Sequence, residues 1–294
     1  MKGRLKQLWG LSPEEISKRL RLRFQARNGG VDKLSIEDYF KLVPNALSWE
    51  RHHRNFLKIE EMARHRYPSW KPFDFENSVF LEVGSGLAGG LAPVALFRGA
   101  RKALLVEPLW REGAFESSEL GINYFRPMWN MLTMVYGERM SFEAWMNRLV
   151  KDTEVHAGGM DSASFSMAPD ICWSLSCLEH IPNLSDSIER LREVCKDSAV
   201  RQIHAVDFGN HLSKDKPFLE MYDRSRSEVQ SKASAHINCL RASDVQSLLE
   251  RAGWNCQQLR MTMAPLNREG IQQSWLDHYS EETLETRVAA FFCS

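Results

Sequence analysis

Four short apolar runs recur along the chain, each bounded by turn or helix signals. Runs of four to seven residues are typical of strands buried on both faces of a sheet. Helical patterns lie between them, over residues 91–98 and 184–195, and a further helix over 243–252 precedes a strand near 255–261 and a last apolar run over 288–292. Alternating strands and helices predict a parallel sheet covered by helices on both faces. The four predicted strands are 79–83, 103–107, 171–175 and 200–206.

Other segments predict additions to this α/β domain. Residues 1–70 are polar and helical in pattern, so we expect a helical N-terminal extension ahead of a main domain over 71–294. Residues 110–150 are rich in aromatic side chains and Met, which predicts a helical insertion. It shapes a substrate pocket, forms a subunit interface such as that of a homodimer, or only packs. Residues 213–236 are charge-rich and are a predicted lid.

The composition is that of a folded globular protein. Apolar residues make up 43% and charged residues 26%, which excludes a disordered chain. The 38 Lys and Arg residues equal the 38 Asp and Glu residues, and this neutral balance argues against a nucleic-acid-binding protein. The six cysteines include no CxxC pair, so we expect reduced thiols, as in a cytoplasmic protein. They stand at positions 172, 177, 195, 239, 256 and 293.

The N-terminal segment is locally basic. Residues 1–28 contain eight Lys or Arg and two Glu. A surplus of this kind favours peripheral contact with an anionic membrane surface, and the alternative is a solvated helix face. The chain has no apolar run of the length that spans a bilayer, and its first residues lack the pattern of a signal peptide. We therefore expect a cytoplasmic protein that visits the inner membrane surface.

The most informative stretch is the end of the first predicted strand. Residues 80–90 read FLEVGSGLAGG, so a buried strand ends near an acid and is followed at once by glycines. Glycines allow a sharp turn and let a ligand lie against the main chain. The spacing Gly84-x-Gly86-x-x-Gly89 also fits a dinucleotide fingerprint, so the glycines alone leave NAD open as a ligand.

Two acids favour S-adenosylmethionine over NAD. Glu82 precedes the glycines, where a carboxylate repels a pyrophosphate and attracts a ligand with a sulfonium and a free amino group. Glu107 closes the second predicted strand, where a carboxylate can accept hydrogen bonds from both ribose hydroxyls. The alternative is an ordinary turn between strand and helix, with acids that only cap helices.

Together these residues resemble the class I S-adenosylmethionine-dependent methyltransferases. The segment Glu82-Val83-Gly84-Ser85-Gly86-Leu87-Ala88 is similar to their motif of an acid followed by GxGxG, with Ala88 in place of the third glycine. Gly159-Met160-Asp161 lies where the family places the acid that holds the adenine amine. Residues 174–182, SLSCLEHIP, resemble the segment after the family's fourth strand. The resemblance covers about residues 75–262.

This resemblance implies a Rossmann-like fold with a mostly parallel seven-stranded sheet, and S-adenosylmethionine as cofactor. A narrower similarity, carried by residues 204–212 and 238–254, is to methyltransferases of surface-polysaccharide and glycan clusters. It implies a glycan or small-molecule acceptor. The residues that the family resemblance assigns to cofactor binding are Glu82, Gly84, Ser85, Gly86, Glu107, Asp161 and Ser174.

Histidines near strand ends are candidates for the base that an alcohol acceptor needs, because its hydroxyl must lose a proton. His180 follows the third of the four predicted strands, and His204, Asp207 and His211 lie at and beyond the fourth. The spacing His204-x-x-Asp207 predicts that the carboxylate orients an imidazole. The alternatives are that these residues cap helices and stabilise loops, or that they share a transition metal. We predict no metal.

The extension carries further histidines. His52-His53-Arg54 are expected on an exposed polar helix face, and the alternative is that they close over the cofactor. The predicted function is O-methylation of a sugar hydroxyl on a glycan or surface polysaccharide. N- or C-methylation of a small metabolite or lipid is one alternative, and a non-catalytic cofactor-binding scaffold is another.

Overall fold

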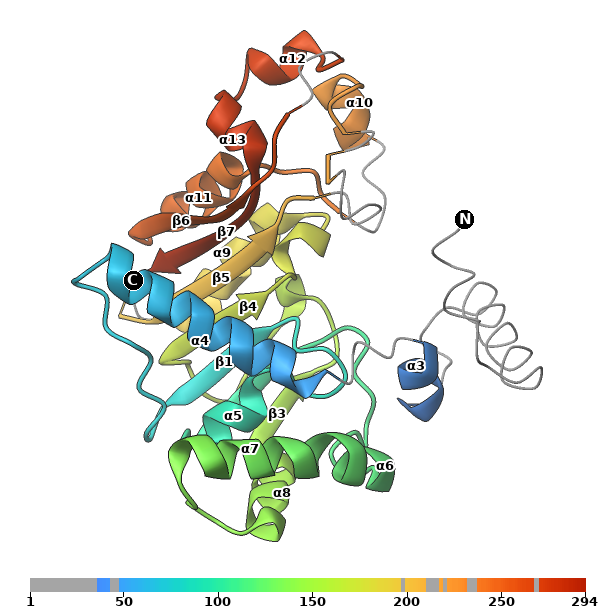
Figure 1. The fold of residues 1–294 in the computed structure, drawn as a ribbon, viewed down its shortest axis with the longest axis vertical. Helices are drawn as coiled ribbons and strands as arrows, with labels where there is room; N and C mark the ends of the chain where they lie inside the picture. Colours follow the sequence, from blue (N-terminus) through green and yellow to red (C-terminus); the bar gives the residue numbers. More distant parts are fainter. Residues whose placement is uncertain are drawn as a thin grey trace.

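A seven-stranded sheet forms the centre of the computed structural model, with strand order β3-β2-β1-β4-β5-β7-β6 (Figure 1). Strand β7 is antiparallel to β5 and β6, and the remaining neighbours are parallel. This confirms the predicted Rossmann-like fold with a mostly parallel sheet. The strands are β1 Val79–Val83, β2 Lys102–Val106, β3 Thr153–His156, β4 Ile171–Leu175, β5 Arg201–Asp207, β6 Cys256–Met263 and β7 Thr286–Cys293. The structure describes residues 36–42, 48–196, 199–209, 217–218, 221–231, 237–266 and 270–294.

The apolar runs in the sequence correspond closely to β1, β2, β4 and β5. The second run was expected to include Glu107, whereas β2 ends at Val106, so Glu107 lies just beyond the strand. Strand β3 was not predicted. Its residues are all half-buried, because it lies at the edge of the sheet, and its mostly polar sequence gives no apolar run.

Helices cover both faces of the sheet (Figure 1). On one face, α4, α5, α7 and α8 form a core with Phe80 and Trp173. On the other, α9 and α11 form a core with Leu81 and Cys172. Neighbouring strand residues thus enter different cores, as the two-residue period of a strand requires. The described helices are α3 Ile36–Leu42, α4 Trp49–Arg66, α5 Ala92–Phe97, α6 Ser118–Leu120, α7 Arg126–Tyr136, α8 Phe142–Lys151, α9 Leu184–Cys195, α10 Arg226–Ser231, α11 Ala242–Arg251, α12 Gln273–Leu276 and α13 Glu281–Glu285.

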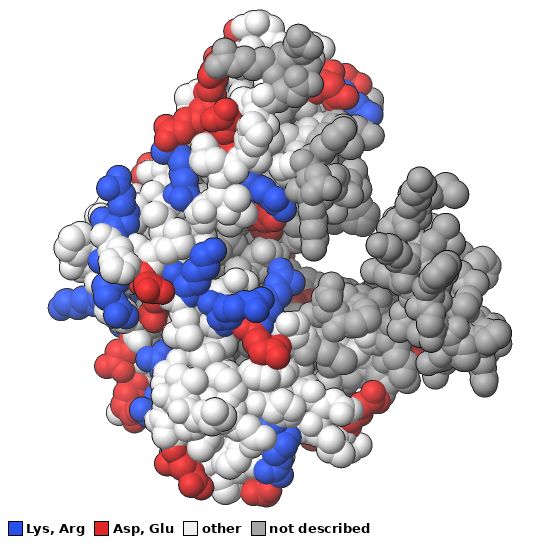
Figure 2. Space-filling view, viewed as in Figure 1, with Lys and Arg blue, Asp and Glu red and all other residues white. Residues whose placement is uncertain are grey.

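Helix α4 crosses the front of the sheet in Figure 1. The ring of Phe56, on this helix, packs edge-on against Trp173 of β4, with ring centroids 5.5 Å apart. Its solvent-facing side is basic, and Figure 2 shows Lys and Arg side chains gathered across the middle of the same view. The helix is therefore amphipathic and belongs to the layer that covers the sheet. Its buried residues are His53, Phe56, Ile59, Glu60 and Ala63.

Several predicted segments lie partly or wholly outside the described residues. The basic stretch within residues 1–28 lies outside them, and so does most of the predicted lid at 213–236, of which α10 is the described helix. The segment 110–150 contains α6, α7 and most of α8. None of the described helices is both long enough and apolar enough to cross a bilayer. The division into an extension and a main domain stays a prediction.

The expectation of six reduced cysteines is wrong for one pair. Cys256 of β6 and Cys293 of β7 form a disulfide, and both side chains are buried. The two residues face each other in the antiparallel pair, with Cα atoms 4.2 Å apart. They are 37 positions apart in the sequence, so their spacing carried no signal, and only strand pairing brought them together. The free cysteines are Cys172, Cys177, Cys195 and Cys239.

Candidate functional site

The turn after β1 forms the centre of the candidate site. Gly84 and Gly86 adopt φ angles of 79° and 65°, which glycine tolerates far better than other residues. The Gly84 N–H donates to the Val106 carbonyl at 2.8 Å, which ties this turn to the end of β2. A Cβ at Gly84 would lie 2.6 Å from Cys177 Cβ, so the turn after β4 packs directly against the glycine turn. The carboxyl ends of three neighbouring strands thus meet here.

Glu107 lies at the end of β2 with both carboxylate oxygens in use. Oε2 accepts from the Gly86 N–H at 2.7 Å, and Oε1 accepts from the Leu109 N–H at 3.0 Å. Its side chain is buried, with a residue exposure of 8%. A carboxylate oxygen has two lone pairs, so each oxygen retains one further acceptor direction. Glu107 can therefore receive two hydroxyl donors while it holds the glycine turn.

Glu82 is fully buried within β1 and points toward the start of α5. Its Oε2 accepts from the Leu91 and Ala92 N–H groups at 2.8 and 3.2 Å, as an acid at a helix N-terminus commonly does. Within the described part of the chain, Oε1 has no hydrogen-bond partner. Burial, opposed by these two backbone bonds, raises the pKa of Glu82 well above its ordinary value. A positively charged donor at Oε1 would offset the cost of burying this acid.

These features fit S-adenosylmethionine. Glu82 presents a buried oxygen that has no donor among the residues that the structure describes, which suits the α-ammonium of the cofactor. Glu107 presents two acceptor directions at the next strand end, which suit the ribose hydroxyls. Gly90 also contributes, because a Cβ at this position would overlap the Glu82 carboxylate. The residues that the sequence assigned to the cofactor's two ends are thus brought together at one edge of the sheet.

The end of β4 and the turn that follows it carry the SLSCLEHIP motif. Ser176 adopts a left-handed backbone conformation, with φ of 49°, and a short helical turn follows over Leu178–His180. His180 is exposed there, on the same edge of the sheet as the glycine turn. Glu179 is buried, and burial raises its pKa to about 8, so this carboxyl group can change charge near neutral pH. Glu179 lies in the quoted motif, but its residue type and position gave no signal that distinguished it from a helix cap.

Two assigned residues lie inside the sheet. His204 is fully buried, with Nδ1 2.9 Å from the Ser174 hydroxyl and Nε2 3.0 Å from the Gln202 amide oxygen. Both ring nitrogens are thereby occupied. Asp207 lies three positions further along β5, so the strand directs the two side chains to opposite faces. The predicted orientation of His204 by Asp207 is therefore wrong, whereas the cofactor role of the buried Ser174 stays a prediction.

We expect acidification to destabilise the fold partly through His204. Burial lowers the pKa of His204 from 6.5 to about 4, so between these values the unfolded chain binds a proton that the folded chain does not. Above pH 6.5 the ring is neutral in both states, whereas by pH 5 the free energy of unfolding is lower by about 2 kcal/mol. Denaturant unfolding at both pH 7 and pH 5 measures this. From pH 7 to pH 5, the free energy of unfolding of His204→Asn should fall by about 2 kcal/mol less than that of the wild type. Equal losses would contradict the prediction.

The remaining assigned residues have varied surroundings. Asp207 ends β5 and accepts from the Gly209 N–H at 2.9 Å, with Arg287 Nε 3.9 Å away. Ser85 is buried in the glycine turn. Asp161 is exposed in the turn after β3, as an adenine contact requires, and this role stays a prediction. His211 lies outside the described residues.

Helix α4 carries two histidines, His52 and His53, that were expected on an exposed face of the helix. His53 is buried, and its Nε2 lies 2.7 Å from the Tyr136 hydroxyl of α7. His52 points toward β1, where its Nδ1 lies 4.0 Å from Glu82 Oε1. The expected exposed face is therefore wrong for both residues. The helical period of α4 decided this, because His52 and Phe56 are four residues apart and share the side that faces the sheet.

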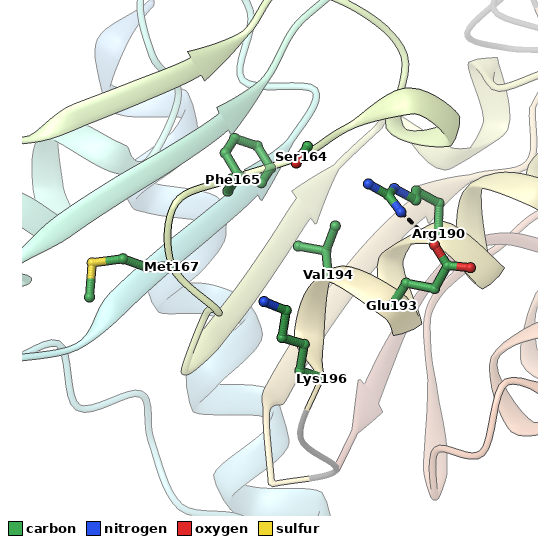
Figure 3. A pocket seen from close by; sticks show the side chains of 7 residues that line it. All are labelled: Ser164, Phe165, Met167, Arg190, Glu193, Val194 and Lys196. Atoms are coloured by element: carbon green, nitrogen blue, oxygen red, sulfur yellow. Dashed lines mark hydrogen bonds and ion pairs between the residues drawn. The ribbon is translucent and has the colours of Figure 1, made fainter.

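A groove lies beside the N-terminal half of α4, and a separate cavity lies next to α9. The groove, about 390 Å³, lies between α4 and α7 and begins at Trp49 and Glu50, beside His52 in sequence. The cavity in Figure 3 is about 110 Å³, is lined by the 164–167 loop and α9, and contains the Arg190–Glu193 ion pair. Ligand pockets usually measure about 300–1,000 Å³, so this cavity is too small for a nucleoside cofactor.

Among the described residues, no three His, Cys, Asp or Glu side chains gather as metal ligands do.

No protein-family model and no curated protein matches the chain. Solved structures do resemble it. Haemonchus contortus phosphoethanolamine N-methyltransferase 2, bound to phosphomonomethylethanolamine and S-adenosylhomocysteine, is 12% identical with a TM-score of 0.47, and the match covers 92% of this chain and 59% of that one. Two bacterial structures also match. An S-adenosylmethionine-dependent methyltransferase from Mesorhizobium loti is 10% identical over 75% of this chain and 92% of its own, with a TM-score of 0.42. The N-methyltransferase NodS from Bradyrhizobium japonicum is 11% identical over 85% and 97%, with a TM-score of 0.41. The likeness concerns the fold alone.

Proposed function

We propose that this protein binds S-adenosylmethionine and transfers its methyl group to an acceptor. The observation that carries the proposal is the pair of acids at neighbouring strand ends. Glu82 offers a buried oxygen that has no partner within the described residues, and Glu107 offers two acceptor directions beside the same glycine turn. An ammonium group and the hydroxyls of a neutral ribose are the two kinds of donor that this arrangement suits.

When bound, S-adenosylmethionine would supply a methyl carbon on a sulfonium, which an acceptor attacks in line. The protein's own contribution is to hold and orient. Glu107 accepts from the ribose while its bonds to Gly86 and Leu109 keep the carboxylate in place. Glu82 accepts from the ammonium while its bonds to Leu91 and Ala92 hold it against α5. Both acids are therefore fixed before the ligand arrives, which lowers the entropy cost of binding.

Glu107→Ala is expected to weaken binding of S-adenosylhomocysteine. The loss of hydrogen bonds to a charged acceptor costs about 1–3 kcal/mol, or roughly 5- to 150-fold in the dissociation constant. Isothermal titration calorimetry measures this. Glu112→Ala is the matched control, because Glu112 is an exposed acid in the same loop and the charge change is identical. Absence of binding by the wild type, or tight NAD binding instead, would contradict the proposed function.

For the acceptor, we propose a sugar hydroxyl, with His180 taking its proton. Support comes from the exposed position of His180 at the carboxyl edge of the sheet. The groove between α4 and α7 adds Trp49, an aromatic side chain suited to stacking on a sugar ring, together with the polar Glu50 and Arg54. The buried His204 is left out of this proposal because its ring nitrogens are both occupied.

The same groove supports a second candidate, a small apolar metabolite or a lipid methylated at nitrogen or carbon. Leu57, Met131 and Val135 line it, and two of these, Leu57 and Val135, are exposed by 41% and 53%. Apolar walls of this kind bind alkyl groups through area removed from water. Mass spectrometry of methylated products from sugars and from alkyl amines distinguishes the two candidates, because it identifies the atom that receives the methyl group.

A further inference from the structure

His52 occupies an unusual position for a residue at the start of a surface helix. Its side chain is 22% exposed and lies against Glu82, which is fully buried. Within the described residues, His52 Nδ1 and Glu82 Oε1 are both buried atoms without a hydrogen-bond partner. Two buried polar atoms that lack partners are costly, and here they face each other. Such a pair points to a donor that occupies the space between them when a ligand is bound.

The distance between these atoms indicates what kind of donor fits. At 4.0 Å, they are too far apart for a direct hydrogen bond. A nitrogen at about 2.9 Å from each would bridge them with an angle of about 90° at the nitrogen, close to what a tetrahedral ammonium offers. Burial and the neighbouring Arg51 lower the pKa of His52 to about 4, so the imidazole is neutral near pH 7. A neutral imidazole with its proton on Nε2 is an acceptor at Nδ1.

We propose that His52 of α4 and Glu82 of β1 jointly accept hydrogen bonds from the α-ammonium of the cofactor, which makes His52 a residue that selects ligands carrying this group. This rests on the proposed function, because it takes S-adenosylmethionine as the ligand. The helix that covers the sheet thereby supplies part of the cofactor site, and cofactor binding stabilises the N-terminal turns of α4 against β1. His53, next in sequence, has no such role because it bonds to Tyr136.

The test compares ligands with and without the ammonium. S-adenosylhomocysteine carries it, and 5′-methylthioadenosine lacks the whole amino acid end but keeps the ribose. His52→Phe keeps an aromatic ring in the same place and removes the acceptor. We expect this variant to bind S-adenosylhomocysteine about 5- to 50-fold more weakly, because it loses one hydrogen bond to a charged group, and to bind 5′-methylthioadenosine within about twofold of the wild type. His52→Gln, whose amide oxygen is an acceptor, should recover part of the affinity.

Two comparisons separate this role from a packing role. His53→Phe is the matched control, and it should change the thermal midpoint without changing the preference between the two ligands. Glu107→Ala should weaken both ligands alike, since both contain the ribose. Equal weakening of both ligands by His52→Phe, or no weakening of either, would overturn the role of His52 while the proposed function stands. If the wild type binds neither ligand, the proposed function itself is wrong and this inference fails with it.

If His52→Phe does not fold, the wild type still tests whether the pair of His52 and Glu82 binds the ammonium. An analogue of S-adenosylhomocysteine with hydrogen in place of the α-ammonium keeps the carboxylate and the ribose. We expect it to bind the wild type at least about tenfold more weakly than S-adenosylhomocysteine, because it leaves the Glu82 and His52 acceptors unpaired. Similar affinities would overturn the proposal. Where the variant does fold, His52→Phe should weaken this analogue by less than about twofold, since the lost acceptor had nothing to bind.

Discussion

His180→Ala is expected to lower the rate of methyl transfer by about 10²–10⁴-fold while leaving affinity for S-adenosylhomocysteine unchanged. Loss of a general base typically costs a factor of this size. Affinity should survive because His180 lies in the turn after β4, whereas the acids assigned to the cofactor lie on β1 and after β2. Transfer of tritiated methyl groups from S-adenosylmethionine to sugar acceptors measures the rate, and calorimetry measures the affinity.

A histidine that is equally exposed but distant serves as the control. His65→Ala removes an exposed imidazole in the last turn of α4 and should leave both quantities unchanged. A rate for His180→Ala within about threefold of the wild type would exclude His180 as the base and would favour catalysis by proximity alone. Parallel losses of rate and cofactor affinity would instead indicate that His180 supports the shape of the site.

Gly84→Ala is expected to destabilise the protein by about 2–5 kcal/mol and to remove cofactor binding. The left-handed backbone at Gly84 costs a residue with a Cβ about 1–2 kcal/mol. Overpacking adds about 1–3 kcal/mol, because the new Cβ would lie 2.6 Å from Cys177 Cβ and closer still to its sulfur. The turn or the Cys177 segment must move, and both line the candidate site. Denaturant unfolding and titration of S-adenosylhomocysteine measure the two effects.

Gly113→Ala is the matched control for the backbone cost. Gly113 has a φ of 80°, nearly that of Gly84, and a Cβ there would meet no atom within 4 Å. It should therefore lose only about 1–2 kcal/mol. A second-site change tests the packing cost directly. Cys177→Gly removes the atoms that the Gly84→Ala side chain would meet, so the double variant should be less destabilised than the sum of the two single variants. Strict additivity would contradict the proposed clash.

The sequence alone was sufficient for the fold class and for the positions of Glu82 and Glu107 beside the glycine turn. Apolar runs at β1, β2, β4 and β5 report burial on both faces of a sheet, which is a local property of each segment. Glu82 lies in a predicted strand just before the glycine turn, and Glu107 closes the next predicted strand, so both were recognised from their positions in the sequence. The pairing of β1 with β2 brings these ends together, and consecutive strands of this kind usually pair, so the order of the strands in the sequence was enough to expect it.

Residue type and spacing were not sufficient where a side chain's role depends on the direction it faces. His204 was expected at the open edge, yet it lies on an inner face of β5 and is bonded to Ser174 of the neighbouring strand. A strand directs residues three positions apart to opposite faces, and helices cover both faces of this sheet, so His204 is enclosed whichever face it takes. Sequence spacing such as His-x-x-Asp carries no record of that choice.

Contacts between segments far apart in the chain depended on the tertiary structure. Packing of α4 across the sheet brought His52 to Glu82, 30 positions later in the sequence. Antiparallel pairing of β6 and β7 opposed Cys256 and Cys293. Strand β3 formed from a polar segment because a neighbour supplied its hydrogen bonds. The physical reason is common to all three: local periodicity determines which face of an element is buried, whereas the partner of that face is set by how the elements pack.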